Sequence, residues 1–274
     1  MCDWSPVTEP VIRSTSNPRV KHLVKLRSRR HRDAEGRFLI EGFRELSRAV
    51  AAGVEIEEVG FCPSLFLGSN EPALLASAEA AGAHLVEYAE DPFRKVSYRD
   101  RPEGLVGLAR QFPTSLNRLS LPREPLVLVV EAIEKPGNLG TMLRTADAAG
   151  VDAVIVCDPT TDPFNPNVVR ASLGCLFIVS LAIGSTAETI AWLAEHDVRL
   201  IATTPATSLL HWQADYLGAC AIAVGSEQYG LSDTLLGAAG QSVRVPMHGD
   251  ADSLNAAMAA GVVLYEALRQ RTAE

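Results

Sequence analysis

Short apolar runs alternate with stretches of helical periodicity along most of the chain. In the first half the pattern predicts strands at residues 38–40, 57–62, 84–87 and 105–109, with helices at 42–52 and 72–81 between them. This order is typical of a compact α/β unit, and we predict a first domain over residues 13–112. Residues 111–125 then contain three prolines and no regular period, so we predict a linker at 113–124.

The second half repeats the alternation with more apolar strands. The predicted strands are 126–133, 153–157, 177–181, 199–203 and 219–224, and the predicted helices are 139–149, 166–173, 186–196 and 253–271. Strands that are apolar on both faces and alternate with helices indicate a parallel sheet covered on each side. We predict a parallel-sheet α/β domain over residues 125–274, with its ligands beyond the carboxyl ends of the strands.

The composition of the chain excludes several classes of protein. With 274 residues, 47% of them hydrophobic and 21% charged, the chain can build two cores and is not disordered. No apolar run approaches the roughly 20 residues of a membrane helix, and the first ten residues lack the features of a signal peptide. Five scattered cysteines without a C-x-x-C pair argue against disulfides and zinc. We predict a cytoplasmic protein that contacts no membrane and holds no metal.

Positive charge is concentrated near the beginning of the chain. The net charge is −8, yet residues 13–48 contain eleven basic and four acidic residues. Dense cations favour binding to a phosphate backbone, because each neutralised phosphate releases counterions. The alternative is a solvated helix face whose apolar stripe packs on the domain. No aromatic residue interleaves with these cations, so base stacking is not expected there. The predicted phosphate contacts are Arg19, Lys21, Arg29, Arg30 and Arg37.

Two loops at predicted strand ends open helices that carry an arginine. In residues 134–150, Asn138 can cap the helix, and Arg144 has no acidic residue four positions earlier to pair with. In the loop at 158–170, Asn165 caps a helix that contains Arg170. Neither a dinucleotide fingerprint nor a phosphate-binding loop of the G-x-x-x-x-G-K-[ST] type occurs, which argues against hydride transfer and ATP hydrolysis.

Two further loops have features of a ligand site. Gly225 and Gly230 frame Glu227 after an apolar strand, where a glycine lets a ligand approach the backbone closely. Residues 245–247 form an extended segment suited to a flat apolar ring that main-chain groups recognise. Ser253 is the predicted cap of the last helix, with Asn255 on its first turn.

Three motifs occur in order within these loops. They are N-x-G-x-x-x-R-T at residues 138–145, G-S-E-x-x-G-L-S at 225–232 and V-P-M-x-G-x-x-x-S-L-N at 245–255. Together they resemble the three motifs of the SpoU/TrmH-type RNA 2′-O-ribose methyltransferases of the SPOUT superfamily. The resemblance spans residues 125–271. The first domain, with N-P-x-V-K from residue 17 and F-L-I-E-G at 38–42, is similar to the small RNA-binding domain of many members.

The resemblance implies an S-adenosylmethionine site built by a deep trefoil knot, and a homodimer with two active sites. Arg144 would be the central catalytic residue, and Arg170 an RNA contact. Because a guanidinium stays protonated, we expect Arg144 to hold the adjacent phosphate and stabilise the developing alkoxide. The residues that would orient Arg144 and the nucleotide are Asn138, Glu227 and Asn255, and Ser253 belongs to the third motif. The implied cofactor contacts are Thr203 or Thr204, Gly225, Val245, Met247 and Leu254.

The substrate and the final helix leave alternatives open. Ribosomal RNA is the first expected substrate, because the arginine-rich first domain exceeds what a catalytic domain needs, and transfer RNA is the second. A non-catalytic RNA-binding factor and a base methyltransferase are rival functions. One side of the last helix is either buried core or a contact between subunits, and it consists of Leu254, Met258, Gly261, Val262, Tyr265 and Leu268.

Overall fold

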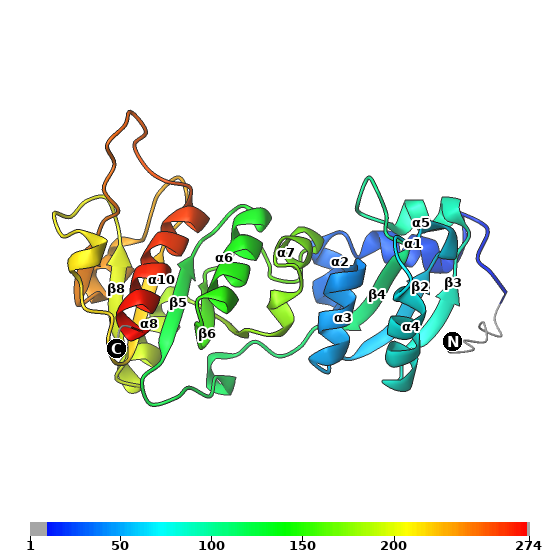
Figure 1. Cartoon of the computed structure of the whole chain (residues 1–274), viewed down its shortest axis with the longest axis horizontal. Helices are drawn as coiled ribbons and strands as arrows, with labels where there is room; N and C mark the ends of the chain where they lie inside the picture. Colours follow the sequence, from blue (N-terminus) through cyan, green and yellow to red (C-terminus); the bar gives the residue numbers. More distant parts are fainter. Residues whose placement is uncertain (1–9, 273–274) are drawn as a thin grey trace. The chain divides into compact units, whose positions relative to one another are not determined.

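The computed structural model describes residues 10–272, which form two compact units (Figure 1). The first unit contains the described residues up to Phe112 together with Pro163–Ile178, and the second contains Pro113–Asp162 and the chain from Val179 onward. The segment Pro163–Ile178 therefore packs with the first unit, although it lies inside the range predicted for the second domain.

The first unit holds a four-stranded mixed sheet between two pairs of helices. In the sheet order β1-β4-β2-β3, only the pair β2 and β3 is parallel. Helices α1 and α5 contact each other on one side, and α3 and α4 on the other. The elements are α1 (Pro18–Lys25), α2 (Arg29–Glu35), β1 (Arg37–Glu41), α3 (Phe43–Ala51), β2 (Ile56–Phe61), η1 (Pro63–Leu65), α4 (Glu71–Ala80), β3 (His84–Glu87), α5 (Glu90–Val96), β4 (Leu105–Arg110), α7 (Pro166–Ala171) and η3 (Cys175–Phe177).

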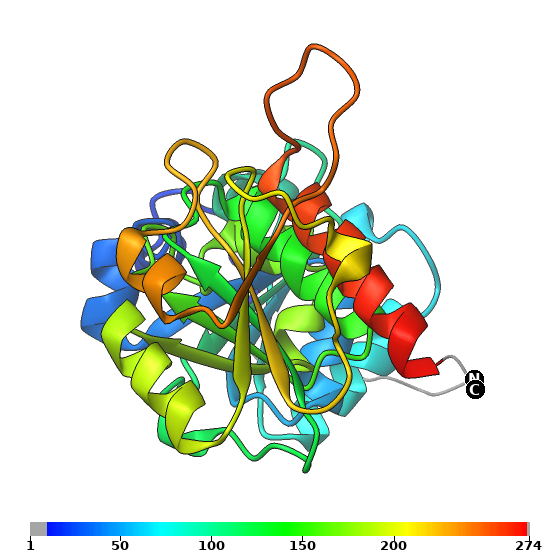
Figure 2. The ribbon, with the colours of Figure 1, turned by 90° about the vertical axis from the view of Figure 1, so that its left-hand side faces the viewer.

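The second unit is a parallel six-stranded sheet in the order β10-β8-β9-β5-β6-β7. Helices α6 and α10 cover one face and α8 and α9 the other (Figure 2), so the central strands are buried on both sides. The elements are η2 (Leu116–Arg118), β5 (Leu126–Glu131), α6 (Pro136–Ala148), β6 (Ala153–Cys157), β7 (Ser180–Gly184), α8 (Thr186–Glu195), β8 (Arg199–Thr203), η4 (His211–Gln213), β9 (Cys220–Val224), α9 (Asp233–Ala238), β10 (Gln241–Val243) and α10 (Ala256–Thr272). The predicted fold class, α/β with a parallel sheet in the second part, is confirmed.

The segment predicted as a linker packs against the second unit. Ile183 of the edge strand β7 donates its N–H to the carbonyl of Thr114 at 2.6 Å, and three leucines, Leu116, Leu119 and Leu121, pack on the core cluster of the sheet. A Cβ on Gly184 would lie 3.0 Å from the Leu116 side chain, so that glycine accommodates the leucine. The segment therefore shields the outer edge of β7.

Some predicted boundaries were wrong for local reasons. The strand predicted at residues 177–181 begins only at Ser180, because Cys175–Phe177 forms a 3₁₀ turn after Leu173 and Gly174 adopt positive φ. Strand β5 ends at Glu131, because Ala132 has φ of 52° and leaves the extended conformation. Helices α5 and α9 and strand β10 were not predicted, and each is only three to seven residues long. No helix within residues 10–272 has the length and apolar character needed to cross a bilayer.

Candidate functional site

The three motifs meet at one edge of the parallel sheet. The loops after β5, β8, β9 and β10 all leave the carboxyl ends of neighbouring parallel strands, so they share that edge. Each predicted catalytic or cofactor residue lies in one of these loops or in the helix that follows it, except Thr203, which is the last residue of β8. The sheet topology thus brings together segments that are more than a hundred residues apart in the chain.

Asn138 connects the three motifs through its side-chain amide. Its Nδ2 donates a hydrogen bond to Glu227 Oε1, and its Oδ1 accepts one from Asn255 Nδ2 at 3.1 Å. Asn138 is not the helix cap that we predicted, because α6 begins earlier, at Pro136, with Lys135 at the capping position. Its amide therefore remains available to join Glu227 to Asn255. Three of the four predicted catalytic side chains form one hydrogen-bonded chain.

Asn255 has a second role that the sequence pattern assigned to Ser253. Helix α10 begins at Ala256, and Asn255 Oδ1 accepts hydrogen bonds from the backbone N–H groups of Ala257 at 3.0 Å and Met258 at 3.4 Å. Asn255, and not Ser253, is thus the residue that caps the helix. The Oδ1 of Asn255 faces α10 and its Nδ2 faces Asn138. The capping bonds therefore hold the amide in the orientation in which Nδ2 donates to Asn138.

The loop that carries Glu227 is tightly folded. Ser226 and Gly230 exchange two backbone hydrogen bonds of 3.1 and 3.0 Å, and Ser226 Oγ accepts from the N–H of Tyr229 at 3.1 Å. A Cβ on Gly225 would lie 2.1 Å from the carbonyl carbon of Gly230, which only a glycine avoids. The loop therefore needs Gly225 in order to close on itself and hold Glu227 toward Asn138.

Glu131, at the end of β5, ties this loop to the sheet and was missed by the sequence analysis. It is 4% exposed, and it accepts hydrogen bonds of 2.7 Å from Ser232 N, Ser232 Oγ and Thr186 Oγ1. Ser232 in turn caps α9 by accepting from the N–H of Leu235. The signal in the sequence is an acid at the end of the otherwise apolar run LVLVVE. Glu131 acts on the site by positioning the 225–232 loop.

Arg144 lies on α6, outside the amide network. Its side chain is exposed and makes no hydrogen bond or ion pair with any residue between 10 and 272. A guanidinium carries a full positive charge and five donors, which here remain available to a ligand. The structure thus brings Asn138, Glu227 and Asn255 into contact and leaves Arg144 unpaired.

The residues implied for the cofactor fit a ligand that brings polar groups. Thr203 Oγ1, and Glu227 Oε2 of the predicted catalytic set, are buried without a hydrogen-bond partner among the described residues, and such groups are costly unless a ligand satisfies them. Thr204 is held in place, because its N–H donates to the carbonyl of Val243 at 2.9 Å. Val245 and Met247 are half-buried, and Leu254 is 37% exposed, so each of these three side chains leaves apolar surface accessible to a ligand.

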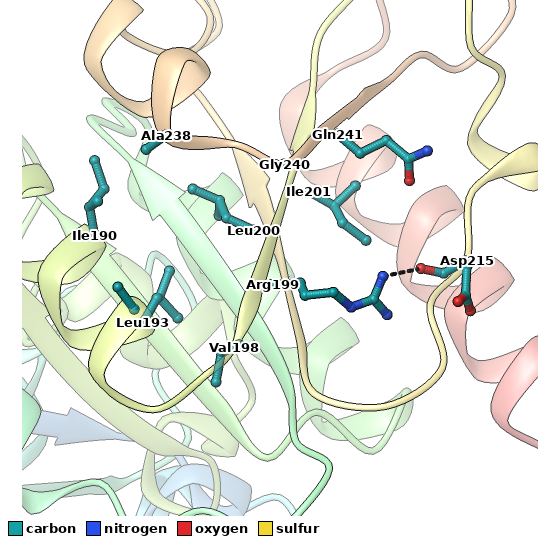
Figure 3. Close-up of a pocket in the computed structure, with 11 residues that line it drawn as sticks. Ile190, Leu193, Val198, Arg199, Leu200, Ile201, Asp215, Ala238, Gly240 and Gln241 are labelled. Carbon is teal, nitrogen blue, oxygen red and sulfur yellow. Dashed lines mark hydrogen bonds between the residues drawn. The ribbon is translucent and has the colours of Figure 1, made fainter.

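A cavity of about 540 Å³ lies at the opposite edge of the same sheet. It is lined by the first residues of β8 and β10 and by the end of α8, including Leu193, Leu200 and Gln241 (Figure 3). Arg199 at its rim donates to the carbonyls of Asp215 and Leu217. None of the predicted site residues lines this cavity, because it lies at the amino ends of the strands.

The predicted phosphate contacts of the first unit differ in their environment. Arg37 pairs with Glu57 at 2.6 Å, and this hydrogen bond lowers the pKa of the Glu57 carboxyl below its usual value. Arg19 lies 3.7 Å from Glu58, and Arg29 lies 3.4 Å from Asp33. Lys21 and Arg30 are exposed, and neither forms an ion pair within residues 10–272. The two unpaired cations are the ones best placed to meet a phosphate.

Arg170 lies with the first unit and not with the catalytic network. It is exposed on α7, where its Nη2 donates to Asn167 Oδ1 at 3.1 Å. Asn165 caps α7 as predicted, by accepting from the N–H of Asn167 at 2.9 Å. Among the described residues no group of three or more His, Cys, Asp or Glu side chains could hold a metal ion.

The chain resembles a set of known proteins over nearly its whole length. The model of the SpoU rRNA Methylase family matches residues 125–265, and that of the MRM3-like substrate binding domain matches residues 17–107. The 23S rRNA (guanosine(2553)-2′-O)-methyltransferase RlmP of Bacillus subtilis is 30% identical over 254 residues, which cover 93% of this chain and 97% of that protein.

Two solved structures share the fold. A crystal structure of an RNA 2′-O ribose methyltransferase has a TM-score of 0.84 and 43% identity, and the match covers 96% of this chain and 99% of that one. The AdoMet-bound rRNA methyltransferase from Sinorhizobium meliloti has a TM-score of 0.88 and 32% identity, over 97% and 99% of the two chains. Because the family model matches residues 125–265 and these proteins match nearly the whole length, the chain belongs to the SpoU rRNA methylase family.

Proposed function

We propose that this protein is an S-adenosylmethionine-dependent RNA 2′-O-ribose methyltransferase that acts on ribosomal RNA. The observation that carries the proposal is the hydrogen-bonded chain Glu227–Asn138–Asn255 at the carboxyl edge of the sheet, because it joins all three motifs. The relative RlmP is a 23S ribosomal RNA methyltransferase, which supports the substrate. The Sinorhizobium meliloti methyltransferase is bound to AdoMet, which supports the cofactor. A ribosomal RNA substrate supports the expectation that the protein is cytoplasmic.

The cofactor site lies among the loops after β8, β9 and β10. We assign its polar contacts to Thr203, whose Oγ1 is an orphaned buried atom, and to the backbone at Thr204 and Gly225. Val245, Met247 and Leu254 supply the apolar surface. Bound S-adenosylmethionine supplies an electrophilic methyl group on a sulfonium. The task of the protein is to hold a ribose hydroxyl in line with that methyl, since orientation contributes a large part of such rate enhancements.

Arg144 is the residue that acts on the ribose. Its exposed, unpaired guanidinium can bind the phosphate next to the target nucleotide and stabilise negative charge that develops on the 2′ oxygen. It cannot serve as a conventional base, because it stays protonated. The nucleotide is positioned against Arg144 by Asn138, Glu227 and Asn255. Glu227 Oε2 can accept a hydrogen bond from the nucleotide, because it has no partner among the described residues.

The first unit binds the RNA outside the active site. Its unpaired cations include Lys21 and Arg30, and Arg170 adds a further exposed guanidinium on the same unit. Ribosomal RNA is the substrate that we propose first, and transfer RNA is the second candidate. The alternative function is a non-catalytic RNA-binding factor, and an assay of methyl transfer distinguishes the two functions.

We also propose a knotted chain. The backbone of Arg244, just after β10, hydrogen-bonds to Leu209 and His211 in the long connection between β8 and β9. Side chains near the end of α10 bond to that same connection: Gln270 to Ala214 and Arg271 to Tyr216 and Gly218. The residue after β10 and the end of α10 thus both bond to the 204–219 connection. These contacts support a chain whose last part is threaded through that connection.

A homodimer is the assembly that the last helix favours. The buried side of α10 consists of Ala256, Ala257, Ala260, Val263, Leu264 and Ala267. The other side carries Met258 and Tyr265, which are 59% and 51% exposed, so that side is not core within this chain. Such an exposed apolar face favours a contact between subunits. Light scattering should give twice the chain mass of 29.4 kDa, and a monomer at micromolar concentration would contradict this.

The test of the function is methyl transfer to 23S ribosomal RNA with the Arg144→Ala variant. We expect the rate to fall by about 100-fold or more, as for removal of one stabilising donor, while the affinity for S-adenosylmethionine stays unchanged. Arg123→Ala is the matched control, because Arg123 is also exposed and forms no ion pair within residues 10–272, but it lies in the 113–124 segment. A wild-type protein that binds RNA without transferring a methyl group would establish the non-catalytic alternative.

A further inference from the structure

Tyr98 presents an aromatic ring on the surface of the first unit. It lies two residues after the end of α5, and the residue is 43% exposed. The guanidinium carbon of Arg27 lies over the ring, 5.8 Å from its centroid. A cation over one face of an aromatic ring is attracted by the electron-rich π system. The ring therefore has a cation beside it and keeps exposed surface for a second planar group.

The Tyr98 ring is held on a rigid base. Glu41, only 9% exposed, accepts hydrogen bonds from the N–H of Tyr98 at 2.7 Å and from the hydroxyl of Ser97. Arg27 Nη2 lies within hydrogen-bond distance of the carbonyls of residues 95, 96 and 97, the last ones of α5 and its cap. Both partners of the cation–π pair are thus fixed before any ligand arrives, which reduces the entropy lost on binding.

The segment Pro163–Ile178 completes the surface around Tyr98. Asn167 Nδ2 donates to the Tyr98 hydroxyl at 3.0 Å, and Asn167 Oδ1 accepts from Arg170 Nη2 at 3.1 Å. One asparagine thus places an exposed guanidinium and an exposed aromatic ring in the same site. Tyr98 and Asn167 are about seventy positions apart in the chain, and no aromatic side chain was expected among the cations.

Helix α1 of the same unit carries further positive charge without an ion-pair partner among the described residues. Helix α1 packs against α5, which leads into Tyr98. Lys21 and Lys25 are exposed on α1 and form no ion pair within the described residues. An aromatic ring flanked by cations is the arrangement by which proteins bind single-stranded nucleic acid, through stacking on the base and contact with the phosphates.

We propose that Tyr98, Arg27 and Arg170 form a binding site for an unpaired nucleotide of the RNA substrate. The nucleobase stacks on the exposed face of Tyr98, and Arg170 binds an adjacent phosphate. The inference rests on the proposed function, because it deepens RNA binding by the first unit. A base inside a duplex presents no free face to Tyr98, so the site selects loops, bulges or strand ends.

The first experiment measures binding to a labelled single-stranded RNA of twelve mixed nucleotides and to its duplex, by fluorescence anisotropy. Tyr98→Leu should raise the dissociation constant for the single strand by about tenfold, as expected for loss of one stacked base. Tyr98→Phe should retain most of the affinity, because it keeps the ring. Leu67→Ala, which alters another exposed apolar residue of the first unit, should change nothing. Thermal unfolding of each variant verifies that it is folded.

The salt dependence separates stacking from charge. Arg170→Gln should reduce the slope of log affinity against log salt concentration by about 0.7, the value for one phosphate contact to a single strand. Tyr98→Leu should leave that slope unchanged, because stacking releases no counterion. If Tyr98→Leu changes the slope as Arg170→Gln does, the stacking role is wrong.

Crosslinking provides a readout on the wild-type protein. RNA that contains 4-thiouridine, irradiated in the complex and mapped by mass spectrometry, should attach at or beside Tyr98. Wild-type methyl transfer to 23S ribosomal RNA is measured in parallel. If methyl transfer occurs but Tyr98→Leu binds normally and no crosslink falls near residue 98, only this inference is overturned. If the wild type binds no RNA and transfers no methyl group, the proposed function fails as well.

Discussion

Gly225→Ala tests whether the closed loop around Glu227 sets the geometry of the active site. A Cβ at this position would lie 2.1 and 2.2 Å from the carbonyl carbon and oxygen of Gly230 and 2.3 Å from the nitrogen of Leu231. All three are backbone atoms, so a side-chain rotation cannot relieve the contact. To reach ordinary contact at about 3.5 Å, the two sides of the loop must separate by roughly 1.4 Å.

The displacement acts on both stability and rate. Overpacking of this kind costs about 1–3 kcal/mol of unfolding free energy. The larger effect falls on catalysis, because Glu227 moves relative to Asn138, and a misplacement of about 1 Å can cost a factor of about 100 in rate. Gly225 also lines the proposed cofactor site, so the affinity for S-adenosylmethionine should fall in the same variant.

The assays are methyl transfer to 23S ribosomal RNA, calorimetric binding of S-adenosylmethionine, and urea unfolding. Gly237→Ala is the matched control, because a Cβ there meets nothing within 4 Å and the residue lies in α9. The control should keep full activity and gain some stability from helix propensity. A Gly225→Ala protein with wild-type rate and cofactor affinity would refute the role given to the loop.

Three further predictions concern two acids and one thiol. Glu131→Ala should lower the unfolding free energy in urea by about 2–3 kcal/mol, because Ser232 and Thr186 lose a charged acceptor, and an unchanged midpoint would contradict this. The hydrogen bond from Arg37 lowers the pKa of Glu57 in the folded protein. The ionised Glu57 therefore stabilises the fold fully above about pH 4.5, and this stabilisation is lost as the pH falls through the lowered pKa. The stability difference between the wild type and Glu57→Gln should therefore shrink in acid, and a constant difference would exclude the pairing. Burial raises the pKa of the Cys157 thiol to about 12, so iodoacetamide at pH 8 should modify it only after unfolding, as peptide mass spectrometry can verify.

The second unit was predictable because its signals are local. Each central strand is a short run of apolar residues between turn residues, and that pattern alone placed β6 and β8 correctly. The resemblance of the three motifs implied that Asn138, Glu227 and Asn255 share one site, and parallel strands bring their carboxyl ends to one edge. The hydrogen bonds between these side chains were not predicted. Glu131 escaped prediction because its partners, Ser232 and Thr186, are 101 and 55 residues away and no sequence spacing links them.

The first unit shows what local patterns do not contain. A run of cations indicates charge density, but the pairing of Arg37 with Glu57 depends on how the sheet folds. In the same way, Asn255 caps α10 because the helix begins at Ala256, and the choice between Asn255 and Ser253 depends on that boundary. The packing of Pro163–Ile178 with the first unit has no sequence signature, and it alone brings Asn167 to Tyr98.

The most direct measurement is the identity of the nucleoside that receives the methyl group. Purified protein is incubated with 23S ribosomal RNA and S-adenosylmethionine labelled in its methyl group, and the RNA is digested to nucleosides for chromatography. We predict label in a single 2′-O-methylated nucleoside, and none with Arg144→Ala. Label in a base-methylated nucleoside, or no label at all with folded wild-type protein, would contradict ribose methylation by this site.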